Sequence, residues 1–141
     1  MIEIILILNA IWFAMGFNLF SLRNKIFAKL LVPRDQRETP VFAILAESGK
    51  FLGGFNLAFA LCNILVLINL TVFPSNEQRA ILLFVFAVAH ATQFGFNLPI
   101  AIQNKSGGGV WQVLKGPMLF IFITDFSLML LNLILAGILF L

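Results

Sequence analysis

Four long apolar stretches dominate this sequence and limit what it can fold into. They cover about residues 2–22, 41–73, 79–103 and 115–141, and most charged residues lie in the short segments between them. Hydrophobic residues make up 61% of the chain and charged residues only 11%. A water-soluble domain of this length cannot bury so much apolar surface, and each stretch is long enough to span a bilayer as a helix. We therefore predict an all-α protein, an integral membrane four-helix bundle that forms a single transmembrane domain over residues 1–141.

The basic residues predict how this bundle is oriented. Segment 23–40 carries five Lys and Arg residues against two acidic ones, and segment 104–114 carries Lys105 and no acidic residue. Because basic loops stay on the cytoplasmic side of a membrane, we expect both segments in the cytoplasm and both ends of the sequence outside. The expected location is the inner membrane of a bacterium.

Composition excludes several kinds of site. The chain has one cysteine, Cys62, and one histidine, His90, so it cannot form an intrachain disulfide or a bis-histidine haem site. Closely spaced metal ligands are missing, and we predict neither a metal nor another cofactor. The net charge of +3 lies mainly in the predicted cytoplasmic segments, where it favours anionic lipid rather than nucleic acid. No catalytic signature is present, so the sequence favours a protein without enzymatic activity while leaving an enzyme open.

Two titratable residues fall deep in the predicted membrane region. His90 follows Arg79 by eleven residues, which is about 16 Å of helix rise, and Asp125 follows Lys115 at a similar depth. The third and fourth spans are joined by a short segment and should be neighbours. We therefore predict a direct or water-bridged hydrogen bond between His90 and Asp125. The pair could serve as a ligand-binding or proton-relay site, or it could be purely structural.

A second polar layer is expected nearer the cytoplasm. The residues of this layer are Asn18, Glu47, Lys50, Gln93 and Asn97. Together with His90 and Asp125 they would line a polar pocket that is open to the cytoplasm and closed at its inner end by His90 and Asp125. Alternatively, Glu47 and Lys50 form an ion pair at the membrane interface. A further set of asparagines is expected to make interhelical hydrogen bonds, namely Asn9, Asn63, Asn69 and Asn132.

Small residues on the second span predict close helix packing. Gly49, Gly53 and Asn56 share one helix face, and the Gly-x-x-x-Gly spacing lets a neighbouring backbone approach closely. On the third span, Pro99 is expected to kink or end the helix.

The order of these features resembles that of small four-span DoxX-like membrane proteins and, more distantly, the ergosterol-biosynthesis scaffold family. The similar segments are the basic NLFSLRNKIFAKLL, the glycine-rich GKFLGGFNLA and the histidine-containing VFAVAHATQFGFNL. The resemblance implies a non-catalytic helper, scaffold or lipophile-binding protein. At the level of single residues, the resemblance extends only to His90 and to the glycine-rich segment.

Three functions are compatible with these features. The first is a membrane protein that binds a lipid or small lipophile, or serves as an accessory subunit or scaffold for a membrane protein partner. The second is a proton-coupled carrier or small channel, which would need a homo-oligomer because four helices rarely enclose a conducting path. The third is a small membrane enzyme acting on a lipid or quinone, with His90 as acid or base.

Overall fold

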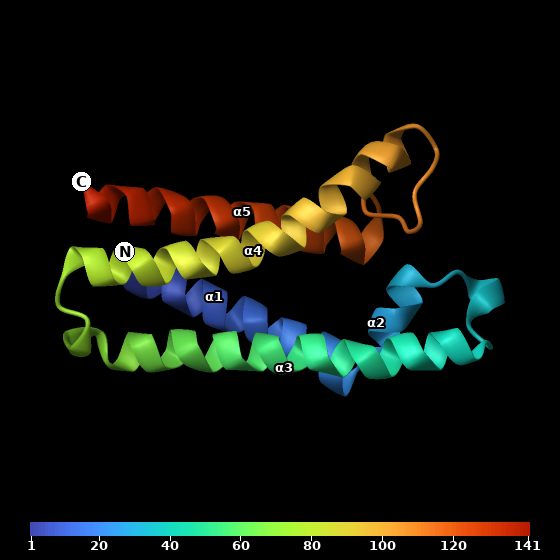
Figure 1. Ribbon diagram of the computed structural model, residues 1–141, viewed down its shortest axis with the longest axis horizontal. Helices are drawn as coiled ribbons and strands as arrows, with labels where there is room; N and C mark the ends of the chain where they lie inside the picture. The colour runs from blue at the N-terminus through green and yellow to red at the C-terminus, as the bar shows by residue number, and fades with distance from the viewer.

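A computed structural model describes all 141 residues and contains five α-helices and no strand (Figure 1). The helices are α1 (Ile2–Phe17), α2 (Asn24–Leu31), α3 (Pro40–Ile68), α4 (Asn76–Lys105) and α5 (Gly116–Phe140). A π-helical turn, Asn18–Leu22, continues α1. Four helical segments are long and apolar enough to cross a membrane, namely α3, α4, α5 and α1 together with its π-helical turn. The all-helical fold and the four candidate spans agree with the prediction from the sequence.

The turn between α3 and α4 differs from the predicted boundaries. The second span was expected to reach residue 73, but α3 ends at Ile68 and a 3-10 turn, Leu70–Val72, follows. Ser75 then begins α4 earlier than expected by forming a capping box with Gln78. In this motif the Ser75 hydroxyl accepts from the Gln78 backbone N–H, and the Gln78 side chain accepts from the Ser75 backbone N–H. Residues 76–78 therefore belong to the helix.

Pro99 does not end α4. The helix continues to Lys105, and Figure 1 shows α4 bending in its second half. Proline removes one backbone hydrogen bond and crowds the preceding turn, which accounts for a bend in a helix that otherwise stays intact.

Helix α2 is an element that the sequence analysis did not predict. It lies within segment 23–40 and packs against α3. Its last carbonyl groups are capped by Arg37, whose Nε donates to Val32 O at 3.0 Å and whose Nη2 donates to Lys29 O at 2.8 Å. This capping stabilises a short helix that would be marginal alone.

The long helices form two pairs, α1 with α3 and α4 with α5. The pairs meet at the end of the bundle that holds both termini and the α3–α4 turn, which we call the closed end, and they diverge toward the end that holds α2, the open end (Figure 1). Two apolar clusters fill the closed end. Their buried members are Ile5, Leu6, Phe13, Ala60, Val66, Ala80, Leu83, Phe86, Leu135 and Ala136. The open end lacks such a core.

The predicted glycine face of α3 does pack against α1 and its π-helical turn. A Cβ atom at Gly53 would overlap the Ser21 side chain and stand 2.9 Å from the Ser21 backbone nitrogen. One at Gly49 would stand 3.3 Å from the Phe20 carbonyl oxygen. Asn56 is buried against Gly16, where an added Cβ would lie 2.8 Å from Asn56 Cγ. The close helix approach predicted from the sequence is therefore confirmed.

Candidate functional site

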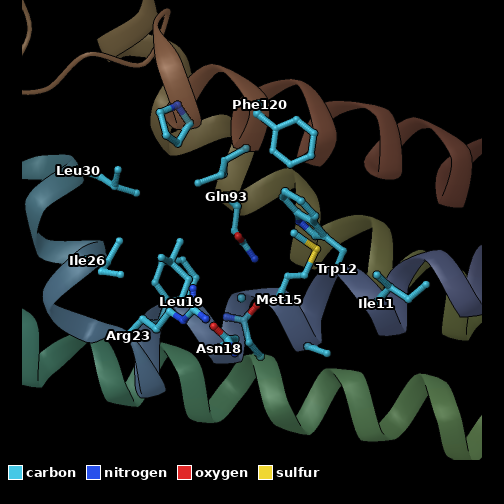
Figure 2. A pocket seen from close by; sticks show the side chains of 16 residues that line it. Ile11, Trp12, Met15, Asn18, Leu19, Arg23, Ile26, Leu30, Gln93 and Phe120 are labelled. Atoms are coloured by element: carbon cyan, nitrogen blue, oxygen red, sulfur yellow. The ribbon is translucent and has the colours of Figure 1, made fainter.

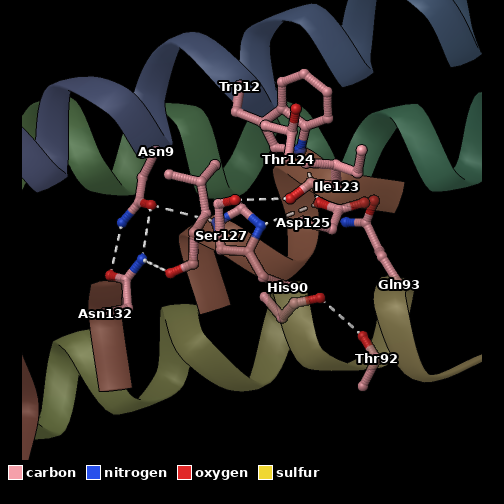
Figure 3. A network of polar contacts seen from close by, with 12 residues as sticks. Asn9, Trp12, His90, Thr92, Gln93, Ile123, Thr124, Asp125, Ser127 and Asn132 are labelled. Carbon is pink, nitrogen blue, oxygen red and sulfur yellow. Dashed lines mark hydrogen bonds and ion pairs between the residues drawn. The ribbon is translucent and has the colours of Figure 1, made fainter. Parts of the chain in front are cut away.

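His90 on α4 and Asp125 on α5 meet in the interior of the bundle (Figure 3). Both side chains are fully buried, and His90 Nδ1 lies 3.2 Å from Asp125 Oδ1. The direct hydrogen bond expected between these residues is confirmed. Because each group would be an unpaired polar atom among apolar side chains without the other, the contact explains how both can be buried.

Three further side chains join this pair and form what we call the polar network. Trp12 on α1 donates its Nε1–H to Asp125 Oδ1 at 2.7 Å. Asn9, one helical turn earlier, lies with its Oδ1 3.2 Å from His90 Nε2. Asn9 also exchanges two hydrogen bonds of 2.9 Å with Asn132 of α5. The polar network therefore links α1, α4 and α5, and so joins the two helix pairs.

The other asparagines behave differently from the prediction. Asn63 and Asn69 bond within α3, donating to the carbonyl groups of Phe59 and Leu65 at 2.9 Å. The expected interhelical role is thus correct for Asn9 and Asn132 and wrong for Asn63 and Asn69. An asparagine in a helix has an acceptor available one turn back, so sequence spacing does not decide between the two kinds of bond.

A cavity of about 610 Å³ lies between the diverging helix pairs (Figure 2). We call it the Arg23 cavity. Its walls come from the second half of α1, the π-helical turn, α2 and the beginning of α5, and ten of its 16 lining residues are hydrophobic. Figure 2 shows Gln93 of α4 pointing into its middle. The side chains of Asn18, Arg23 and Gln93 line it without making hydrogen bonds to other protein groups.

A second cavity of about 370 Å³ adjoins the first, and we call it the Asp125 cavity. The two cavities share four lining residues, which are Phe20, Leu30, Gln93 and Ile121. Asp125 lines the second cavity, and its Oδ2 is buried without any hydrogen-bond partner. His90 lines neither cavity. The polar network therefore borders the Arg23 cavity through Trp12 and the Asp125 cavity through Asp125.

Trp111 covers the Asp125 cavity from the segment between α4 and α5. Its Nε1–H donates to Asn97 Oδ1 at 3.1 Å. Asn104 fixes this segment because its Nδ2 donates to the Gly108 and Trp111 carbonyl groups, and its Oδ1 accepts from the Val113 N–H. A well-bonded loop thus positions the indole over the cavity.

The structure brings together part of the predicted polar pocket, but the walls of both cavities are mostly hydrophobic and His90 lines neither of them. Gln93, Asn97 and Asp125 line one cavity, and Asn18 lines the adjoining one together with Gln93.

The inclusion of Glu47 and Lys50 in that pocket is wrong. Their side chains are 64% and 52% exposed and lie 2.6 Å apart as an ion pair, and Asn24 Nδ2 donates to Glu47 Oε1 at 3.1 Å. Neither residue lines the Arg23 or Asp125 cavity. The alternative of an ion pair between two exposed side chains therefore describes their geometry.

Five residues of the site were not among the functional candidates predicted from the sequence, namely Asn9, Trp12, Arg23, Trp111 and Asn132.

No group of three or more His, Cys, Asp or Glu side chains is close enough to hold a metal ion. Comparison with protein-family models, with curated proteins and with solved structures gives no match to this chain.

Proposed function

We propose that this protein binds a lipophilic molecule between its two helix pairs, inside the membrane. The observation that carries the proposal is the pair of adjoining cavities at the open end. Their volumes, about 610 and 370 Å³, fall in the range of small-molecule sites. Mostly apolar walls with a few free polar groups, which are Asn18, Arg23, Gln93 and Asp125 Oδ2, suit a molecule with a large apolar body and a small polar group.

The division of the bundle into a packed and an unpacked end supports this role. Apolar clusters and the polar network hold the closed end together, whereas the open end keeps space between helices that could have packed against each other. In the proposed orientation the open end faces the cytoplasmic leaflet of a bacterial inner membrane, because segments 23–40 and 104–114 carry the basic residues. A lipophile would enter from the lipid phase or be passed to a membrane protein partner.

Filling the Arg23 cavity tests the proposal. Ile26 of α2 lines this cavity and is 48% exposed, whereas Ile64 of α3 is 43% exposed and lines neither cavity. We expect wild-type protein, extracted gently from its own membrane, to retain a lipophile in its native mass spectrum. Ile26→Trp should lose most of this molecule, and the matched control Ile64→Trp should keep it. Equal retention by the two variants, or a wild-type protein without any bound molecule, would contradict the proposal.

Proton-coupled transport is a second candidate, and the buried His90–Asp125 pair favours it. The pair holds a proton between two titratable groups, one of which borders a cavity. Protein reconstituted in vesicles with a pH-sensitive dye should then carry protons down an imposed gradient, and Asp125→Asn should abolish the flux. Vesicles that hold the gradient as well as protein-free vesicles would exclude this candidate.

A further inference from the structure

The orientation of the two asparagine amides in the polar network follows from one backbone carbonyl. Asn132 Nδ2 donates to Leu128 O at 2.8 Å, and a carbonyl oxygen can only accept. The amide nitrogen of Asn132 must therefore face this carbonyl. Because Asn9 and Asn132 exchange a donor and an acceptor in each direction, the orientation of Asn132 also fixes that of Asn9. Asn9 consequently presents its oxygen, and not its nitrogen, to His90.

This oxygen sets the tautomer of the imidazole. His90 Nε2 lies 3.2 Å from Asn9 Oδ1, and an oxygen acceptor at this distance requires a proton on the nitrogen. The Nε2 atom of His90 therefore carries a proton in every state of the polar network. One further proton remains to be placed, between His90 Nδ1 and Asp125 Oδ1.

Both arrangements of this shared proton leave Asp125 Oδ2 as a hydrogen-bond acceptor. With the proton on Nδ1 the pair is an imidazolium and a carboxylate, and Oδ2 is a carboxylate oxygen. With the proton on Oδ1 the pair is neutral, and Oδ2 is the carbonyl oxygen of the acid. A proton on Oδ2 would leave two lone pairs facing each other across the 3.2 Å between Nδ1 and Oδ1. The geometry therefore leaves Oδ2 as an acceptor, and no protein group donates to it.

We infer that Asp125 Oδ2 accepts a hydrogen bond from the hydroxyl group of a neutral lipophile seated in the Asp125 cavity. The inference rests on the proposed function and names the chemical class of its ligand. A cationic donor is disfavoured because His90 and Asp125 with their shared proton carry no net charge, and the adjoining cavity holds the unpaired Arg23 guanidinium. A hydroxyl can also accept, and the Gln93 amide, which lies beside Asp125 (Figure 3), can donate to it.

The two tryptophans of the chain provide a readout for this inference. Trp12 lines the Arg23 cavity and Trp111 lines the Asp125 cavity, so a brominated ligand in either place quenches fluorescence. The probes are 9,10-dibromooctadecan-1-ol and its methyl ether, compared at equal mole fractions in nanodiscs containing the wild-type protein. The methyl ether keeps the oxygen and the brominated alkyl chain of the alcohol but cannot donate a hydrogen bond. We expect the alcohol to bind about tenfold more tightly, as for one buried hydrogen bond to a charged or polar acceptor.

Two variants test whether Asp125 causes the tighter binding of the alcohol. In Asp125→Leu no side-chain oxygen faces the ligand, so the preference for the alcohol should disappear. Glu47→Leu makes the same chemical change at an exposed carboxylate outside both cavities and should keep the tenfold preference.

The outcomes separate this inference from the proposed function. Saturable quenching by both probes with equal affinity would leave lipophile binding in place and overturn the role of the hydroxyl. Quenching that rises in proportion to the mole fraction of the probe, without saturation, would overturn the role of the hydroxyl and the proposed lipophile binding as well. If Asp125→Leu does not fold, the ratio measured on the wild-type protein decides the question alone.

Discussion

Replacing Gly53 by alanine should destabilise the bundle, whereas the same replacement at the adjacent Gly54 should stabilise it. A Cβ atom at Gly53 would overlap the Ser21 side chain and lie 2.9 Å from the Ser21 backbone nitrogen, while one at Gly54 meets nothing within 4 Å. Ser21 has little freedom to move because its hydroxyl donates to Lys50 O at 3.2 Å. Relief of the overlap therefore requires α1 and its π-helical turn to move away from α3.

The magnitude follows from two opposing effects. Alanine favours a helix over glycine by about 0.5–1 kcal/mol, and this gain applies equally to the two positions. Overpacking at Gly53 costs about 1–3 kcal/mol in addition. We therefore expect the free energies of unfolding of Gly53→Ala and Gly54→Ala to differ by about 1–3 kcal/mol, because the helix-propensity gain cancels in the comparison.

Unfolding with sodium dodecyl sulfate in mixed micelles, followed by helical circular dichroism, measures this difference directly. Thermal unfolding in the same mild detergent should rank wild type between the two variants. Equal stability of Gly53→Ala and Gly54→Ala would refute the reasoning, because it would mean that the Gly53 face meets lipid and not α1.

Two further predictions concern the polar network and the topology. His90→Ala and Asp125→Ala should each lower the free energy of unfolding by about 3–5 kcal/mol. The double variant should lose less than the sum of the two, because each single change already breaks the pair. Strictly additive losses in a double-mutant cycle would show that the two side chains act independently. Single cysteines replacing Arg34 and Ser106, in a background without the native cysteine, should react with a membrane-impermeant maleimide only after cell lysis, whereas one replacing Asn76 should react in intact cells. The reverse pattern would invert the proposed orientation.

Position along the helix axis is the part of the site that the sequence predicts well. Helix rise is constant, so counting residues from the basic ends of α4 and α5 placed His90 and Asp125 at one level, and the structure joins them. The four candidate spans were predicted from the length of the apolar stretches. Glycine spacing also predicted the packed face of α3, because the Gly-x-x-x-Gly pattern of Gly49 and Gly53 lets a neighbouring backbone approach closely.

The sequence does not predict which side of each helix faces the interior of the bundle when no glycine pattern marks it. In a soluble helix the apolar face marks the core, but here the exposed faces of the four candidate spans are as apolar as the interior. Glu47 and Lys50 were therefore placed in the pocket when they lie on an exposed face of α3. Trp12 was missed because its apolar body hides a hydrogen-bond donor, although its spacing of three from Asn9 puts both on one face of α1.

The polar network is proposed to fix the imidazole tautomer of His90 and thereby to leave Asp125 Oδ2 as an acceptor for a ligand. The chain has a single histidine, so ¹⁵N-histidine labelling gives one imidazole spectrum for the protein in nanodiscs. We expect a proton on Nε2 that exchanges slowly with water, because Asn9 and the surrounding helices bury it. A bare Nε2 with the proton held on Nδ1 would exclude the proposed tautomer, since Asn9 would then present its nitrogen and Asp125 Oδ2 could itself carry a proton.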